Sequence, residues 1–144
     1  MMAQKITDWT TRYVQGVTDG NIIAGRMVRQ ACARHLNDLT DGKKRGLFFD
    51  VAAAHRVFQF FRTLRLTEGD NDGKPFLLEP SQKFIIGSLF GWKAKDGTRR
   101  FRTAYIEQGK GNGKSPLAAG IGLYGLTSDG ESGAEIYSAA VTVD

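Results

Sequence analysis

Glycine occupies every second position of a short segment that ends in lysine and serine. The segment covers residues 108–115 and reads Gln-Gly-Lys-Gly-Asn-Gly-Lys-Ser. Glycine adopts backbone conformations that other residues avoid, and it weakens a helix or strand that it interrupts. The segment therefore predicts a tight loop. Because small residues let backbone N–H groups converge, such a loop is suited to hold an anion such as a phosphate group.

The sequence on either side of this loop predicts regular structure. Residues 101–106 alternate between two sets of side chains, which predicts a strand. The apolar segment 114–126 predicts a helix, and residues 134–143 predict a further strand. Strand, glycine loop, helix and strand follow one another in this order around phosphate-binding loops, where the N-terminus of the helix adds a favourable partial charge.

Each loop residue has an expected role in such a site. The glycines supply backbone freedom, Lys114 would contact the β and γ phosphates, and the Ser115 hydroxyl would bind Mg²⁺. Lys110 is a second cation in the same loop. The strict Walker A pattern has glycine where this chain has Gln108, so the match is partial. The predicted nucleotide-binding residues of the loop are Gly109, Lys110, Gly111, Asn112, Gly113, Lys114 and Ser115.

The chain before the loop predicts mainly helices. Residues 19–39 carry an apolar stripe that predicts one helix, and Asp50 is the expected N-cap of a second helix that reaches Leu64. A polar turn over 68–73 follows. The apolar segment 82–92 then has helical spacing and predicts a third helix.

These elements predict an α/β fold in two parts. Residues 1–67 form an N-terminal helical segment, and residues 74–144 form the first part of a P-loop NTPase-type domain. That second part would hold the helix over 82–92, the Walker A loop, and the helix and strand that follow. Two strands are fewer than a sheet of this type needs, so we expect an incomplete domain.

The composition excludes several classes of protein. Hydrophobic residues make up 41% and charged residues 24% of the chain, which are values of a globular protein. The single Cys32 excludes an internal disulfide, and two histidines cannot by themselves complete a usual four-ligand zinc site. No apolar segment approaches the roughly 20 residues needed to span a bilayer. We therefore expect no membrane partner and a cytoplasmic location.

Positive charge is concentrated around the glycine loop. The chain has a formal net charge of +5, with eight basic and two acidic residues over 83–114, and four acidic and no basic residues over 116–144. A basic stretch of this kind suits a phosphate-bearing partner, either a nucleotide or a nucleic acid. A solvated basic face is the plainer alternative.

Several motifs together resemble the large terminase subunit of tailed bacteriophages, the motor that packs DNA into the capsid. The resemblance extends over nearly the whole chain, and one of its motifs reads Gly-Lys-Pro-Phe-Leu-Leu-Glu-Pro-Ser-Gln-Lys-Phe-Ile-Ile over residues 73–86. The first loop glycine is commonly missing in that family, which accounts for Gln108. The segments that carry the resemblance are 13–39, 48–61, 73–86, 89–92, 99–115 and 129–140.

The resemblance implies specific ligands and partners. The family has a glutamine upstream of the loop that reads adenine, and Gln82 stands at that position. It usually has a loop arginine proposed to stabilise charge on the transferred phosphate, and Lys110 stands there. Lys110 and Lys114 are therefore the expected catalytic residues, and ATP and Mg²⁺ the expected cofactors. Double-stranded DNA, the small terminase subunit and the portal are the implied partners, in a bacterial host cell and encoded by a phage or prophage.

The acidic residues after the loop limit the expected activity. Phosphoryl transfer of this kind needs acids at the end of a strand, and none of Asp129, Glu131, Glu135 and Asp144 follows an apolar strand. With no Walker B acids and no nuclease domain, we expect ATP hydrolysis in a full-length parent and little or none in this chain alone. Two alternatives stay open: another P-loop enzyme such as a helicase or kinase, or a non-catalytic basic fragment that binds DNA or a packaging partner.

Overall fold

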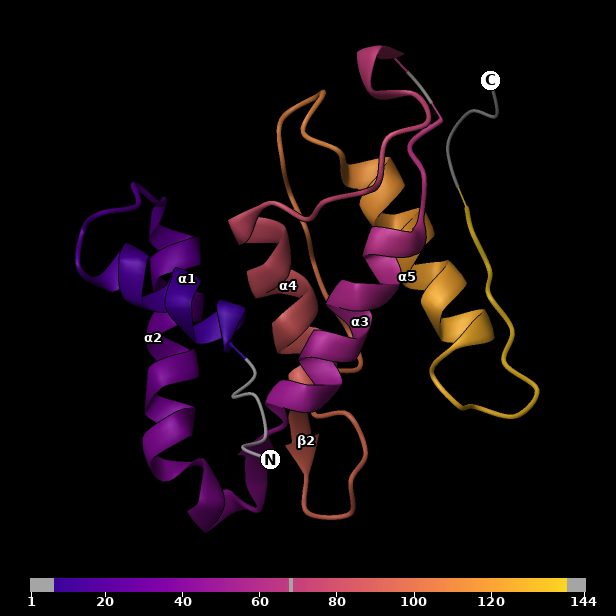
Figure 1. The fold of residues 1–144 in the computed structure, drawn as a ribbon. Coiled ribbons are helices and arrows are strands. Elements are labelled where there is room, and N and C mark those ends of the chain that lie inside the picture. Colours follow the sequence, from indigo (N-terminus) through magenta and orange to yellow (C-terminus); the bar gives the residue numbers. More distant parts are fainter. Residues whose placement is uncertain (1–6, 68, 140–144) are drawn as a thin grey trace, which may run out of the picture. The chain divides into compact units, whose positions relative to one another are not determined.

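A computed structural model describes residues 7–67 and 69–139 of the chain (Figure 1). The chain divides into two compact units, Met1–Ile106 and Glu107–Asp144. The first unit contains α1 (Trp9–Thr18), α2 (Arg26–Asp41), η1 (Gly42–Arg45), β1 (Leu47–Phe49), α3 (Val51–Thr63), η2 (Gly69–Asn71), α4 (Pro80–Gly91) and β2 (Trp92–Ala94). The second unit contains α5 (Lys114–Thr127).

Helix α4 is the centre of the first unit. It packs against both α1 and α3, and α1 packs in turn against α2 (Figure 1). The side chains of Phe84, Ile86 and Phe90 are buried along α4. A helix that is apolar on most of its surface requires neighbours on several sides, which explains why α4 lies between other helices.

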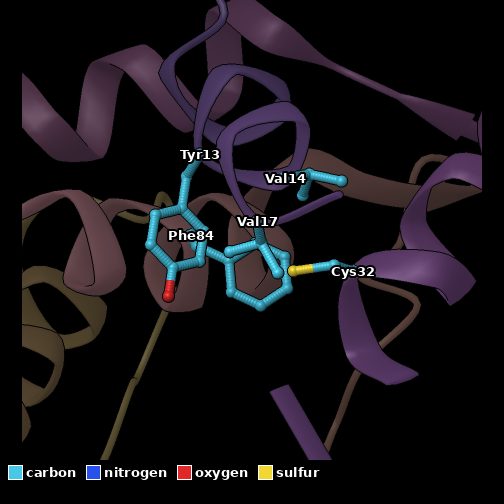
Figure 2. Close-up of a cluster of buried hydrophobic side chains, with 5 residues drawn as sticks. All are labelled: Tyr13, Val14, Val17, Cys32 and Phe84. Atoms are coloured by element: carbon cyan, nitrogen blue, oxygen red, sulfur yellow. The ribbon is translucent and has the colours of Figure 1, made fainter. Parts of the chain in front are cut away.

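One hydrophobic cluster joins α1, α2 and α4. Figure 2 shows its five buried side chains, which are Tyr13, Val14, Val17, Cys32 and Phe84. The rings of Tyr13 and Phe84 are stacked, with their centroids 5.3 Å apart. The Cys32 side chain is 1% exposed, as expected for a small side chain on an apolar stripe.

Two glycines of α4 allow its neighbours to approach closely. A Cβ atom at Gly87 would lie 1.8 Å from Thr10 Oγ1 of α1. A Cβ atom at Gly91 would lie 2.5 Å from the Phe49 ring of β1. Neither distance is sterically possible, so glycine at these positions is a condition for this packing.

The two short strands form an antiparallel pair. Leu47 lies opposite Ala94 and Phe49 lies opposite Trp92. The turn after β2 is closed by a hydrogen bond from the Gly97 N–H to the Ala94 carbonyl and by a left-handed Gly97. Residues 95–98 therefore form a tight turn after β2.

Two polar residues of α2 are buried and form hydrogen bonds or ion pairs with other side chains. His35 is 2% exposed, and its Nδ1 accepts a hydrogen bond of 3.0 Å from the Trp92 indole. Asp38 binds the guanidinium groups of both Arg45 and Arg100. Burial disfavours the charged form of Asp38, but the hydrogen bonds from these arginines outweigh burial and hold the pKa of the carboxyl below its usual range.

The second unit consists of the glycine loop, α5 and the segment that follows. This segment returns along the helix, because a Cβ atom at Gly122 would lie 3.3 Å from the Ile136 side chain (Figure 1). Residues 128–139 have no helix or strand.

Most of the helices expected from the sequence are confirmed. The Asp50 carboxylate caps α3 by accepting a hydrogen bond from the Ala53 N–H, and α5 begins at Lys114 as expected. The expectation for 19–39 is wrong at its start, since residues 19–25 form a turn and α2 begins at Arg26. Helix α1 was not expected, although its buried residues Tyr13, Val14 and Val17 have helical spacing.

Both expected strands are wrong where the structure describes them. Residues 101–106 and residues 134–139 are irregular, and residues 140–143 lie outside the described part. An alternating pattern describes which side chains can share a face, but a strand also needs a neighbouring strand to accept its backbone hydrogen bonds. Among the described residues β1 and β2 are the strands that pair, and Arg65–Pro75 and Lys93–Arg99 form isolated bridges outside residues 101–106. The α/β class is confirmed in a limited form: the part of the chain that the structure describes holds five α-helices and a two-stranded sheet.

Candidate functional site

The glycine loop adopts a backbone that depends on two of its glycines. Gly111 has a φ angle of +84° and Gly113 has a φ angle of +72°. Side chains with a Cβ atom rarely adopt these left-handed conformations. The Asn112 N–H, between them, donates to the Gly109 carbonyl over 3.4 Å and closes the turn. The sequence therefore predicts this loop correctly from its glycine spacing.

The loop leads directly into the N-terminus of α5. Gly113 is the N-cap, with no capping side chain, and its carbonyl accepts from the Leu117 N–H over 3.1 Å. Pro116 has no N–H, and within the described residues the N–H groups of Lys114 and Ser115 have no acceptor. A left-handed residue followed by a right-handed one turns successive N–H groups toward a common point, where an anion can bind. The helix N-terminus favours negative charge at the same place.

The loop side chains are exposed, and one lysine reaches across the loop. Lys114 Nζ donates a hydrogen bond of 2.5 Å to the Gln108 carbonyl. Lys110 and Ser115 are exposed and have no hydrogen bond or ion pair to any residue that the structure describes. The donors available to an anion are therefore two ammonium groups, one hydroxyl and the N–H groups at the start of α5. This set fits the triphosphate of a nucleotide.

Gln82 lies in the first unit, where its side chain already forms a hydrogen bond. Its side-chain oxygen accepts a hydrogen bond of 2.9 Å from the Glu79 N–H, while the Glu79 carboxylate accepts from the Gln82 N–H. This reciprocal pair is a capping box for α4. Gln82 is 7% exposed. The structure thus gives Gln82 a structural role that the sequence analysis did not foresee, although Glu-x-x-Gln before an apolar segment is the sequence signal for it.

Of the acidic residues after α5, Asp129, Glu131 and Glu135 lie in the described part of the chain and Asp144 lies outside it. Glu135 accepts a hydrogen bond of 2.5 Å from the Tyr137 hydroxyl, and Asp129 lies in the turn after the helix. No three His, Cys, Asp or Glu side chains come together among the described residues. The side-chain oxygens of the loop that suit a hard cation such as Mg²⁺ are the Ser115 hydroxyl and the amide oxygens of Gln108 and Asn112.

Two features of the first unit bring distant residues together and were not expected from the sequence. One is the polar network around His35 and Asp38, which joins α2 to β2 and to Arg100. The other is a cavity beside Trp9 and Lys83. Neither has a local sequence signal, since each is formed by residues far apart in the chain. Within the described residues, no helix is long and apolar enough to cross a membrane.

Comparison with known protein families matches one part of the chain. Residues 80–144 match the family described as the terminase large subunit, ATPase domain. The matched range includes α4, the glycine loop and α5. Searches of the curated proteins and of the solved structures gave no match.

The family match confirms the resemblance identified from the sequence motifs. The similarity to the terminase large subunit ATPase domain covers residues 80–144 of the chain.

Proposed function

We propose that the chain binds ATP through residues 108–115, as part of the ATPase domain of a terminase large subunit with a P-loop-type fold. One observation carries this proposal: the left-handed Gly113 leads into α5, whose first N–H groups have no acceptor within the described residues, in a segment that matches an ATPase family. A loop that only reversed the chain would not need a lysine and a hydroxyl at this helix start.

Each side chain has a distinct part in the proposed site. The N–H groups of Lys114 and Ser115 bind phosphate oxygens, and the Lys114 ammonium exchanges the Gln108 carbonyl for a phosphate. Ser115 is the Mg²⁺ ligand, and the ion when bound neutralises phosphate charge. Lys110 adds a second positive charge at the loop, although a lysine lacks the planar, bidentate geometry of arginine.

The wider role follows from the family. We propose that the protein of which this domain is a part hydrolyses ATP to move double-stranded viral DNA into a capsid. The small terminase subunit and the portal are then its partners, in the cytoplasm of a bacterial cell, with a phage or prophage as the source of the gene. The division into a helical segment over 1–67 and an ATPase part over 74–144 belongs to the same proposal.

The test of the proposed site is ATP binding by a loop variant. Lys114→Ala removes one charge-assisted hydrogen bond, and we expect a loss of about 2 kcal/mol, or roughly 30-fold in affinity. Lys43→Ala is the matched control, because Lys43 is also an exposed lysine near the start of a helical element, in this case η1. Calorimetric titration of both variants with ATP and Mg²⁺ measures the difference. Equal ATP affinity in Lys114→Ala and the unaltered chain would exclude the loop and favour a non-catalytic binding role.

A second titration tests base recognition by Gln82. If Gln82 reads adenine, Gln82→Ala weakens the binding of ATP but not of inorganic triphosphate. Glu79→Ala is the control, because it disrupts the same capping box from the other side and leaves the amide in place. Equal loss of ATP affinity in both variants would make the effect of Gln82 structural.

A further inference from the structure

A shallow cavity lies beside the two-stranded sheet of the first unit. Its volume is about 450 Å³, which is within the range of ligand-binding sites. It is formed by η1, the start of β1 and the turn after β2. The lining residues are Lys43, Lys44, Gly46, Leu47, Phe48 and Lys95.

The pairing of β1 and β2 places an aromatic ring among lysines. Phe49 and Trp92 lie opposite each other on the inner face of the sheet, where their ring centroids are 5.3 Å apart. Successive residues of a strand point to opposite faces. The next pair, Phe48 and Lys93, therefore shares the outer face. Lys95 joins Phe48 in the lining of the cavity.

The apolar part of the cavity is open to solvent. Phe48 is 43% exposed, whereas Trp92 on the inner face is 1% exposed. Gly46 has a φ angle of +69°, and a Cβ atom there would lie 3.4 Å from Lys95 Cβ. A side chain at this position would take up space next to Lys95. An exposed ring beside an open cavity is a place where an apolar side chain of a partner can be buried.

The lysines of the cavity give it a positive charge. The ammonium groups of Lys43 and Lys95 have no ion pair or hydrogen bond with any residue that the structure describes. Lys44 pairs with Asp41 over 2.7 Å, but both side chains are exposed, and such a pair exchanges partners at little cost. The lining thus holds three lysines and, within the described chain, no aspartate or glutamate.

We propose that this cavity binds an extended acidic segment of a partner protein, with one apolar side chain of that segment packed against Phe48. Carboxylates pair with the lysines and the apolar side chain covers the ring. Duplex DNA would satisfy the lysines, but its charged backbone has no apolar side chain for the ring. A second copy of this chain would bring lysines against lysines, which disfavours self-association through this face. The proposal does not depend on ATP binding by the glycine loop.

The experiment titrates the full chain into fluorescent peptides and follows their anisotropy. The probe is a peptide with one central phenylalanine flanked by aspartate and glutamate. One matched peptide has alanine at the centre, and another has asparagine and glutamine in place of the acids. We expect each change to weaken binding at least about tenfold, because the first removes the apolar contact and the second removes the charge. Added salt should weaken both acidic peptides and preserve the ratio between them, since salt screens only the charges.

Variants of the chain assign the binding to this cavity. Lys95→Glu reverses one charge of the lining and should weaken binding of the probe at least about tenfold. Lys74→Glu makes the same change on an exposed lysine that does not line the cavity, and should leave affinity within about twofold. Phe48→Ala should remove the preference for the phenylalanine peptide over the alanine peptide. The three altered side chains are exposed, so the variants are expected to fold.

Several results would overturn the proposal. The probe might as a matter of measurement show no binding to the unaltered chain, or lose affinity equally in Lys95→Glu and Lys74→Glu. An undiminished preference for phenylalanine in Phe48→Ala would place the apolar contact elsewhere. A short DNA duplex that binds more tightly than the probe, and loses this affinity in Lys95→Glu, would assign the surface to nucleic acid instead.

Discussion

Lowering the pH is expected to destabilise the first unit through one buried histidine. His35 Nδ1 accepts from the Trp92 indole over 3.0 Å, and His35 Nε2 lies 2.9 Å from Thr11 Oγ1. The Thr11 hydroxyl in turn donates to Asp8 over 2.5 Å. An indole N–H only donates, so His35 Nδ1 must be unprotonated. The arrangement requires a neutral ring with its proton on Nε2.

Burial is the main reason why the pKa of His35 is lowered. The carboxylates of Asp8 and Asp38 oppose this effect, and the Arg100 guanidinium adds to it. A second proton on the ring would place two donors face to face, His35 Nδ1–H and the Trp92 indole. The charged form therefore loses a buried hydrogen bond as well as its hydration.

The sign and size of the pH effect follow from this shift. In the unfolded chain His35 titrates near its usual pKa of about 6.5, whereas in the folded chain it titrates lower. Above about pH 6.5 the His35 ring is mostly neutral in both the folded and the unfolded chain, and the free energy of unfolding then has its full value. As the pH falls below that value the unfolded state binds the proton first, and stability falls by up to about 1.4 kcal/mol per pH unit. Between about pH 7 and pH 5.5, the loss amounts to at most about 1.2 kcal/mol.

Urea unfolding followed by tryptophan fluorescence over this pH range is the assay. His35→Asn keeps an acceptor for Trp92 but does not titrate, so its stability should be lower near pH 7 and nearly independent of pH. His55→Asn is the control, because the His55 ring hydrogen-bonds with Gln59 and, among the described residues, takes no part in the His35 network. We expect it to retain the pH dependence of the unaltered chain. A flat profile for the unaltered chain, or an undiminished slope in His35→Asn, would refute the reasoning.

Three further substitutions probe other parts of the fold, each by urea unfolding at neutral pH. Asp38→Asn removes the buried charge that binds Arg45 and Arg100, and should lower the free energy of unfolding by about 2 to 3 kcal/mol. This loss is smaller than for a fully buried ion pair because Arg45 is half exposed. A loss below about 1 kcal/mol would contradict this expectation. Gly87→Ala forces α1 and α4 apart and should cost about 1 to 3 kcal/mol, whereas no loss would show that the helices reposition freely. Asp50→Ala removes the cap of α3 and should cost about 1 kcal/mol, and a neutral result would mean that water replaces the carboxylate at no cost.

Features that depend on a few neighbouring residues could be predicted from the sequence. The helix after Asp50 was predictable because an acidic cap and an apolar stripe act within a few turns of the chain. The glycine loop was predictable because the φ angles of Gly111 and Gly113 are a property of those residues themselves. The start of α5 follows from the loop that precedes it.

Features that depend on a distant partner could not be predicted. Residues 101–106 have the composition of a strand, but pairing depends on a second segment that a local pattern does not contain. Gln82 was expected at a ligand, yet its side chain completes a capping box at the start of α4. A single glutamine suits both roles by its chemistry.

The sequence by itself determined the loop, the helices after Asp50 and at Lys114, and the recognition of the terminase family. These depend on backbone preferences, short-range spacing and the identity of residues in motifs. Only the tertiary structure decided that His35 meets Trp92 across 57 positions of the chain, and that Trp9, Arg62 and Lys83 line one cavity. The physical reason is that burial and desolvation are properties of the packed chain, so a side chain acquires its final role from neighbours that the local sequence does not name.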